Sequence, residues 1–425
     1  MKRFVWIALL LVAALGFFYL NRISLSISQQ DYGEIPAMNQ QVDFSDLNDA
    51  NEEMRSVWFS YLDWNILFKG KDQQAFTQAA QNVLENLQSL NCNTLFLHVR
   101  SFGDAMYPSQ YYPWSSSCSG TLAKDPGYDP LQIFIEQAHQ KNIAVHAWVN
   151  PMRTMTDQEF SQIAHSYPIK SWYDSSKRSD YMMQDSTGRW ILIPGNPEVQ
   201  QLISNGVKEL VENYDIDGIH MDDYFYPSGV DQLPQNDTSY FQKLGSNVGI
   251  EDWRRSSVTQ MMQGIYQAAH QAKAEIQVGV SPQSSLSANH DKLFADVEQW
   301  VKTDGIIDYI VPQIYFGFQN SSQPFDQTAA QWNQLVEGTQ TKLYIGLACY
   351  KIGLDNDAHA GNGKQEWQAV AQSSNDILKR QVECIRQLSN CKGFGLYDYK
   401  SIFAEDGSIQ PTIAKELENL KSILG

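Results

Sequence analysis

Short apolar segments alternate with amphipathic stretches eight times along this chain, and this repeat restricts the fold more than any other feature of the sequence. Runs rich in β-branched and aromatic residues predict strands, and apolar residues spaced along one helical face predict helices. Eight strand–helix units indicate an α/β fold of the (β/α)8 TIM-barrel type. A doubly wound open sheet is the alternative, but no glycine-rich phosphate loop follows any strand. The expected strands are residues 55–61, 94–100, 143–149, 216–222, 276–281, 307–315, 342–348 and 393–399, and the expected helices lie near 72–90, 128–141, 197–213, 250–273, 290–303, 325–337, 374–389 and 411–424.

The connections between these elements are unequal in length. Helix-to-strand turns are short, whereas the loops after the second, third, fourth and seventh strands are long, and the third runs from about residue 150 to 196. Long loops in a compact domain are usually functional, and in a TIM barrel the loops that follow strands form the catalytic face. The sequence therefore predicts a large cleft at that face, suited to a polymer.

The N-terminus predicts export. Lys2 and Arg3 precede an unbroken apolar run over residues 4–20, which is near the lower limit for spanning a bilayer and has no small-residue cleavage site. We expect residues 1–22 to be an uncleaved transmembrane anchor, 23–54 a polar stalk and 55–425 the barrel. The protein would then be a single-pass cell-membrane protein with an extracytoplasmic domain. The alternative is a cleaved signal peptide and secretion.

Composition excludes some functions. The formal charge of −17 is wrong for a nucleic-acid-binding protein, which needs a basic surface for phosphates. The five cysteines lack metal-ligand spacing and are expected to be free thiols, and no cofactor or obligate protein partner is inferred. Eleven Trp and twenty-one Tyr either fill a large core or supply the flat surfaces on which sugars stack.

Strand alternation sorts the polar residues into those that face the barrel interior and those that do not. On the fourth strand Ile219 and Met221 face the helices, which leaves Asp222 inside at the strand end. It is the only acid that this alternation places inside. Buried polar groups cost free energy unless they have partners, so a cluster of them implies a network or a site. The inward residues are Phe96, His98 and Arg100 on strand two, His146, Trp148 and Asn150 on strand three, Gly218, His220 and Asp222 on strand four, Gln277, Gly279, Ser281 and Gln283 on strand five, and Tyr309, Val311, Gln313 and Tyr315 on strand six.

Asp222 and Asp223 are the expected catalytic pair, because glycosidic bond cleavage generally needs two carboxyl groups. Adjacent residues point to opposite faces of a strand unless the strand ends between them. If it does, Asp223 reaches the rim as the acid/base; otherwise it caps the loop. Asp63, Asp104 and Asp398 are reserve carboxyls that more readily serve as loop caps or ion pairs, and Asp217 and Asp308, at strand beginnings, are expected to be structural.

Two further chemistries remain open. A sugar's own 2-acetamido group can act as the nucleophile, with Asp222, Asp223 and Tyr315 orienting it and supplying the acid. Alternatively, His98, His146 and His220 could ligate a catalytic metal together with Asp222, as in a metal-dependent deacetylase. No HxH pair occurs on a strand, so hydrogen-bonded core histidines are favoured and no metal site is assigned.

These segments resemble the glycosyl-hydrolase-like 10 family (the DUF187 group) of bacterial proteins. The most specific stretch is YDIDGIHMDDYFYP at 214–227, after NPE at 196–198. The other matches are VWFSYLDW at 57–64, VRSFGDAMYPS at 99–109, AWVNPMR at 147–153 and PQIY at 312–315. The resemblance covers nearly all of residues 55–420. One departure is the eighth strand, where Asp398 stands in a stretch that is more often Phe-Ser-Tyr, which makes Asp398 a poor general acid.

The resemblance implies an exported barrel acting on bacterial polysaccharide, with peptidoglycan glycan strands the leading substrate. It supports Asp222 and Asp223 as catalytic, since distant relatives that cut partially deacetylated poly-N-acetylglucosamine carry a similar pair. We expect an endo-acting glycoside hydrolase; the alternatives are a non-catalytic barrel that binds wall glycan, or the deacetylase. Trp58, Trp148, Tyr224 and Tyr315 are candidate stacking platforms, and core packing is the alternative for Trp58 and Trp148. The expected substrate-binding residues are Trp58, Arg100, Asp104, His146, Trp148, Asn150, Arg153, His220, Tyr224, Gln283, Gln313 and Tyr315.

Overall fold

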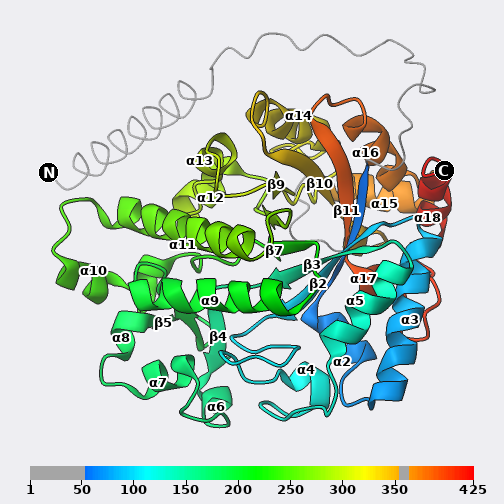
Figure 1. Ribbon diagram of the computed structural model, residues 1–425. Coiled ribbons are helices and arrows are strands. Elements are labelled where there is room, and N and C mark those ends of the chain that lie inside the picture. Colours follow the sequence, from blue (N-terminus) through cyan, green and yellow to red (C-terminus); the bar gives the residue numbers. More distant parts are fainter. Residues whose placement is uncertain (1–52, 354–362) are drawn as a thin grey trace, which may run out of the picture. The chain divides into compact units, whose positions relative to one another are not determined.

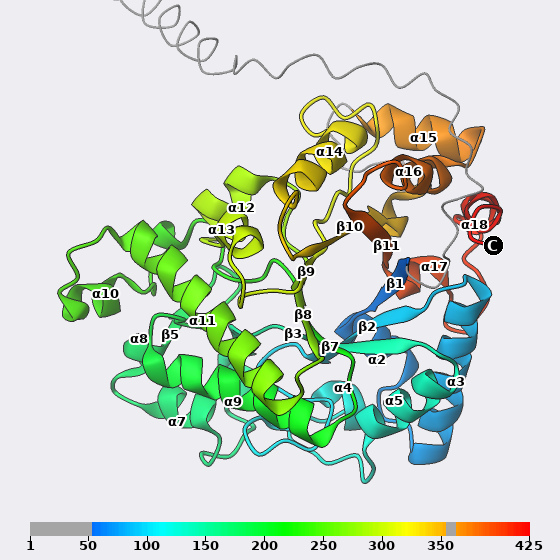
Figure 2. The ribbon, with the colours of Figure 1, turned by 45° about the horizontal axis from the view of Figure 1, so that its top comes forward.

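The computed structural model describes residues 53–353 and 363–425, and in this part of the chain eight parallel strands close into a barrel (Figures 1 and 2). The order around the barrel is β1, β2, β3, β7, β8, β9, β10 and β11, with β11 pairing back to β1. Each strand therefore neighbours the barrel strand next to it in sequence, as the predicted TIM barrel requires. The barrel strands are β1 (Met54–Phe59), β2 (Thr94–Arg100), β3 (Ala144–Val149), β7 (Gly218–Met221), β8 (Gln277–Val280), β9 (Tyr309–Ile310), β10 (Lys342–Ala348) and β11 (Cys391–Tyr397).

Helices surround the strands, as Figure 2 shows. One follows each barrel strand: α3 (Gln73–Ser89), α5 (Pro130–Gln140), α9 (Pro197–Asn213), α11 (Ile250–Ala272), α13 (Val297–Lys302), α14 (Phe325–Leu335), α16 (Ile377–Ile385) and α18 (Ala414–Lys421). Further helices lie in the connections: α2 (Tyr61–Leu67), α4 (Ser116–Ser119), α6 (Asp157–Phe160), α7 (Pro168–Asp174), α8 (Arg178–Tyr181), α10 (Thr238–Leu244), α12 (Leu286–Lys292), α15 (Lys364–Gln372) and α17 (Tyr399–Ile402).

Local sequence determines where several of these helices begin. The side chains of Asp72, Asp129 and Asn196 accept hydrogen bonds from backbone N–H groups in the first turns of α3, α5 and α9. In α5 and α9 the capping residue is followed by a proline at the first helical position, where its missing N–H costs nothing. These starts therefore lie close to the expected ones.

Two elements differ from the sequence-based expectation. The helix expected near 290–303 is divided into α12 and α13, because Phe294 between them has a φ of 52° that no helix can contain. The sixth strand is regular only over Tyr309–Ile310. It continues as isolated bridges from Gln313 to Gln283 and Gly346, so the inward register persists to Gln313.

The long loop after β3 is folded rather than irregular. It contains a separate antiparallel sheet in the order β4 (Arg153–Thr156), β6 (Arg189–Leu192) and β5 (Met182–Gln184), with α6, α7 and α8 in its connections. In Figure 1 this insert lies beside α9. It places Arg153 at the start of a hydrogen-bonded strand, opposite Ile191, so that residue is held by backbone pairing.

Two apolar cores hold the barrel together. The larger joins the outward faces of the strands to the helices, and it contains Leu95, Leu97, Val145, Ile219 and Met221. The smaller fills the barrel interior and is largely aromatic: Met54, Trp58, Phe96, Trp148, Tyr309, Val311 and Tyr344, with Tyr397 against it. The close packing of this interior is visible at Gly218, where a Cβ atom would lie 2.4 Å from Nδ1 of His146.

Two acids at the opposite end of the barrel are structural, as expected. The Asp217 carboxylate accepts hydrogen bonds from the backbone N–H of Val145 and from His139. The Asp308 carboxylate likewise accepts hydrogen bonds from the backbone N–H of Val278 and from His270. Each carboxylate thus ties a strand beginning to a neighbouring strand, which agrees with a stabilising role for this end of the barrel.

The five cysteines are free thiols, as expected, and Cys92, Cys118 and Cys349 are buried. The expected anchor, and the stalk up to residue 52, lie outside the described residues. Over the residues that are described, no helix is both long and apolar enough to cross a bilayer.

Candidate active site

Asp222 lies at the end of the fourth barrel strand, directly after β7, and is 6% exposed. Its Oδ1 accepts hydrogen bonds from Nδ2 of Asn150 at 2.6 Å and from the backbone N–H of Tyr224 at 2.9 Å. No hydrogen bond from the described residues reaches Oδ2. One oxygen of this carboxyl therefore fixes its orientation, and the other remains available to a substrate.

Asn150 connects Asp222 to His98 on the second strand. Since Nδ2 of Asn150 faces the carboxyl, its Oδ1 faces His98 and must accept from Nε2 of that ring, at 3.0 Å. The His98 ring stacks on Trp148 with centroids 3.9 Å apart. Burial and the charge of Arg153 hold the pKa of His98 well below its usual value, so the ring is a neutral donor. The chain His98–Asn150–Asp222 thus orients the carboxyl through three adjacent strands.

Asp223 is held by the ends of strands five and six. Its Oδ2 accepts from Nε2 of Gln283 and its Oδ1 from Nε2 of Gln313, each at 3.1 Å. The Gln313 amide also donates to the backbone oxygen of Ser281, which fixes its direction. The strand ends after Met221, so Asp222 and Asp223 both reach the catalytic face. The strand was expected to end between the two acids, and it ends one residue earlier. Asp223 is bound by side-chain amides rather than used as a loop cap.

The two carboxyls have different electrostatic environments. Burial, followed by repulsion from Asp223, raises the pKa of Asp222 to about 6. Burial also raises the pKa of Asp223, but the hydrogen bonds from Gln283 and Gln313 oppose that shift because they favour the ionised form. The positive charge of Arg153 lowers the pKa of both groups. This difference is typical of a pair in which one member holds a proton.

Tyrosines form one wall beside the pair. Tyr224 is 53% exposed at the rim, and its ring contacts Arg153. The ring centroids of Tyr315 and Tyr397 lie 5.5 Å apart. Burial raises the pKa of Tyr397, and the negative charges of Asp398 and Asp222 raise it further. Tyr397 was missed in the sequence reasoning, although strand alternation places it inward with Gly393 and Gly395. The same periodicity, extended to strand eight, would have found it.

The structure corrects the expected position of Arg100. A register shift between His98 and Arg100 pairs Arg100 with the outward-facing Val149 instead of the inward position. Its guanidinium packs on the Tyr112 ring at 4.5 Å and against Gly206 of α9. A β-bulge of this kind turns the side chain to the opposite face, so Arg100 lies in the helix layer.

Asp104 is also placed differently from its expected role. It is buried, and its Oδ1 accepts from the backbone N–H groups of Ser101 and Phe102, so it caps a turn.

The reserve carboxyl Asp63 likewise caps α2 through Ser60 and accepts from the Lys400 backbone. Burial and the nearby Asp398 raise the pKa of Asp63 to about 7. Asp398 is buried against Lys400 and Ser401.

Trp58, His146 and His220 lie one layer below the carboxyls, in the barrel core. The Trp58 indole N–H donates to Nε2 of His220 at 3.0 Å, which fixes the proton of His220 on Nδ1. That Nδ1 lies 3.0 Å from the Tyr309 hydroxyl, which also lies 2.8 Å from Nδ1 of His146. Trp58 and Trp148 are at most 4% exposed, so core packing is the correct reading of both rings.

This network bears on the metal hypothesis. Nε2 of His98 and both ring nitrogens of His220 are occupied by protein hydrogen bonds, as is Nδ1 of His146. Over residues 53–353 and 363–425, no group of three or more His, Cys, Asp or Glu side chains could hold a metal ion. The three histidines are hydrogen-bonded residues of the barrel core.

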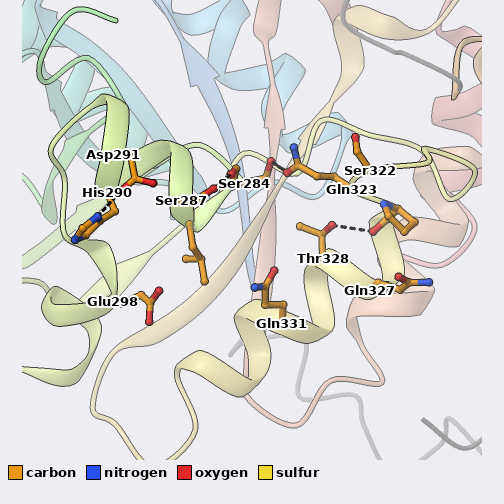
Figure 3. A pocket seen from close by; sticks show the side chains of 13 residues that line it. Ser284, Ser287, His290, Asp291, Glu298, Ser322, Gln323, Gln327, Thr328 and Gln331 are labelled. Atoms are coloured by element: carbon orange, nitrogen blue, oxygen red, sulfur yellow. Dashed lines mark hydrogen bonds and ion pairs between the residues drawn. The ribbon is translucent and has the colours of Figure 1, made fainter. Parts of the chain in front are cut away.

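A polar hollow of about 810 Å³ lies between α12 and α13 on one side and α14 on the other (Figure 3). None of the sequence-predicted site residues lines it. It begins at Ser284, which follows Gln283 directly, and Ser284 donates to Oε1 of Gln323. Its other lining residues include Ser287, His290, Asp291, Glu298, Gln327 and Gln331.

Two bacterial glycosyl hydrolases are similar to this chain over most of its length. Glycosyl hydrolase YngK of Bacillus subtilis is 32% identical over 389 residues, which cover 87% of this chain and 72% of that protein. Glycosyl hydrolase DigH of Escherichia coli K12 is 33% identical over 332 residues, which cover 72% of this chain and 75% of that protein.

Solved structures show the same fold. The glycoside hydrolase domain of PgaB (BpsB) from Bordetella bronchiseptica has a TM-score of 0.56 at 13% identity, over 88% of this chain and 99% of that one. The catalytic domain of beta-amylase from Paenibacillus polymyxa has 0.55 at 12%, with the same coverage. Residues 53–361 also match the family model described as glycosyl hydrolase-like 10. The chain therefore belongs to the glycosyl hydrolase-like 10 family.

Proposed function

We propose that this protein is a glycoside hydrolase that cleaves an amino-sugar polysaccharide of the bacterial cell envelope, with peptidoglycan glycan strands as its substrate. The observation that carries the proposal is the pair Asp222 and Asp223 at the end of the fourth strand, one carboxyl with a free oxygen and the other fixed by two amides. Paired carboxyls in unlike environments are the machinery that glycosidic cleavage requires.

The environments suggest how the two carboxyls divide the work. Asp222, with a pKa raised to about 6 and an unbonded Oδ2, holds the proton and donates it to the leaving glycosidic oxygen. Gln283 and Gln313 donate to both oxygens of Asp223, and these hydrogen bonds favour its ionised form. Its negative charge then faces the positive charge that develops on the sugar. This assignment reverses the one drawn from the sequence, in which Asp223 was the acid/base on the rim.

The surroundings of the pair supply substrate binding. Tyr224 and Tyr315 are partly exposed rings on which sugar faces can stack. The hollow between α12 and α14 offers a further polar surface for a long polymer (Figure 3). Its serine and glutamine side chains offer hydroxyl and amide groups of the kind that bind sugar hydroxyls.

The proposed place of action is outside the cytoplasm. Its support is the apolar run over residues 4–20 behind two basic residues, which suits an uncleaved membrane anchor. The barrel would then face the wall polysaccharide that it cuts. Secretion after signal cleavage is the other outcome, and the size of the mature protein in a membrane fraction distinguishes the two.

The test is turnover of purified glycan strands by the full chain and by Asp222→Asn. We expect the wild-type protein to release soluble fragments with new reducing ends and the variant to release none. Asp125→Asn, at an exposed turn, controls for the loss of a carboxylate elsewhere. If both proteins release the same products, or if neither releases any, the enzymatic proposal fails and a glycan-binding barrel replaces it.

A further inference from the structure

We propose that Arg153 recognises a carboxylate on the sugar bound beside Asp222, so that the substrate is an anionic amino sugar such as one carrying the lactyl ether of muramic acid. This inference rests on the proposed function, since it names a feature of the substrate of that site. The Arg153 side chain is in an unusual state for an arginine beside two carboxyl groups.

Two aromatic rings fix the guanidinium of Arg153 in position. Its Cζ lies 4.1 Å from the centroid of the Tyr224 ring and 4.5 Å from that of Phe102, and its backbone is held in β4. No hydrogen bond or ion pair joins its guanidinium to any residue within 53–353 and 363–425. The side chain is half-buried, so its donors face accessible space. The rings hold the guanidinium in place before any ligand arrives, which reduces the entropy lost on binding.

The neighbouring arginine provides a contrast. Arg189 contacts the same Phe102 ring, with its Cζ 3.9 Å from the centroid. Its guanidinium, however, donates to the Thr154 backbone oxygen and forms an ion pair with Glu159. Arg189 is thus a structural residue of the insert, and Arg153 is the one of the two that keeps its donors free.

Arg153 lies close enough to the catalytic pair to meet the same sugar. Its charge lowers the pKa of both Asp222 and Asp223, and Tyr224, which it contacts, donates its backbone N–H to Asp222. Neither carboxyl uses Arg153 as a hydrogen-bonding partner, because Asn150, Gln283 and Gln313 fill that role. A free planar guanidinium matches the two oxygens of a carboxylate. A neutral N-acetylglucosamine polymer has no group that would use it in this way.

The test measures binding by the full-length Asp222→Asn protein, which removes turnover from the measurement. The ligands are glycan strands without stem peptides and the same strands with the lactyl carboxyl reduced to an alcohol. We expect the first to bind about 10- to 100-fold more tightly, as for a charge-assisted paired contact. Adding Arg153→Lys keeps the charge but removes the planar fork, and it should bring the ratio to within about threefold. The matched change Arg189→Lys should leave the ratio intact.

Three results would overturn the inference. The parent protein could show no preference, or Arg153→Lys could leave the preference unchanged. In the third result, Arg153→Lys weakens the binding of both glycans equally, which would mean that Arg153 does not contact the carboxylate directly. A uronic-acid oligosaccharide serves as a further ligand. Preferential binding of it would support carboxylate recognition and count against peptidoglycan as the substrate. Because binding is read without turnover, failure of the hydrolase proposal appears separately, as absence of cleavage by the wild-type protein.

Discussion

Replacing Asp222 by Asn should stabilise the protein at neutral pH, although it removes the proposed proton donor. Asn keeps Oδ1, which can still accept from Asn150 and from the Tyr224 backbone. The change removes a negative charge from a site that is 6% exposed and close to a second carboxyl. An ionised carboxyl held in such a place costs folding free energy, because burial and repulsion favour its neutral form.

The magnitude follows from the pKa. Folding raises the pKa of Asp222 from 3.8 to about 6. The folded state therefore binds this proton more tightly than the unfolded state. The resulting stability is fully present below about pH 4 and is lost as the pH rises through about 6. A shift of roughly two pKa units corresponds to about 3 kcal/mol. The variant has no such loss, so its advantage over the wild type should grow by about that amount between roughly pH 4 and pH 7.5.

The assay is urea unfolding of both proteins across this pH range, with Asp125→Asn as the control for removing an exposed carboxylate. Taking the difference between variant and wild type cancels the other titrating groups. A difference that stays constant to within about 0.5 kcal/mol would refute the reasoning, since that is the usual effect of a surface substitution. Asp222 would then not be desolvated, and the case for a protonated acid would be lost.

Four further outcomes are expected. The kcat/KM of the wild type for glycan strands should fall as the pH rises above about 6, because Asp222 loses the proton it donates. Gln313→Leu should lower kcat by about 10- to 100-fold with little change in KM, measured in steady state, because Asp223 loses a hydrogen bond that keeps it ionised and oriented. Arg254→Met should destabilise the fold by about 3–5 kcal/mol in urea, because Arg254 forms a buried ion pair with Asp237 in the segment after β7. Gln327→Ala, on the face of α14 that lines the hollow, should raise KM for long glycans and leave it unchanged for short ones.

Each of these has a contrary result. A kcat/KM that does not change above pH 6 would reassign the acid. Normal kcat in Gln313→Leu would mean that Gln283 alone holds Asp223. Wild-type stability in Arg254→Met would show that the segment after β7 does not depend on this ion pair. An equal KM increase for short and long glycans would place the hollow outside the polymer path and point to a general defect.

Most of the barrel and the position of Asp222 could be predicted from the sequence, because both depend on regular alternation. Each strand shows its outward apolar face, and the remaining positions must point inward. That reasoning places Asn150, Gln283 and Gln313 correctly around the carboxyl pair. It fails for Arg100, because a register shift between His98 and Arg100 breaks the alternation and leaves no signal in the residue types.

Other features depend on packing that one sequence does not reveal. Trp58 and Trp148 have the composition of sugar platforms, yet they fill the barrel because the inner layer needs large rings. The free state of Arg153 results from the insert sheet and the ring of Tyr224, which belong to different loops. The division of the helix after β8 follows from the backbone at Phe294, where a residue other than glycine has a positive φ.

The layering of the barrel explains why the chemistry is confined to one level. Below the carboxyl pair, Trp58, His220 and Tyr309 form a buried hydrogen-bonded layer that leaves no room for a sugar. The next polar level upward contains Asn150 and Asp222, which is the first point where a carboxyl meets the face formed by the loops. Strands two, three, five and six each supply one member of the His98–Asn150–Asp222 and Asp223–glutamine networks, and strand four supplies both carboxyls. The two carboxyls therefore keep their geometry only in the closed barrel. The inner layer therefore supports the site from below. Substitutions that loosen its packing should reduce catalysis by displacing Asp222, although the substituted residues do not contact the substrate.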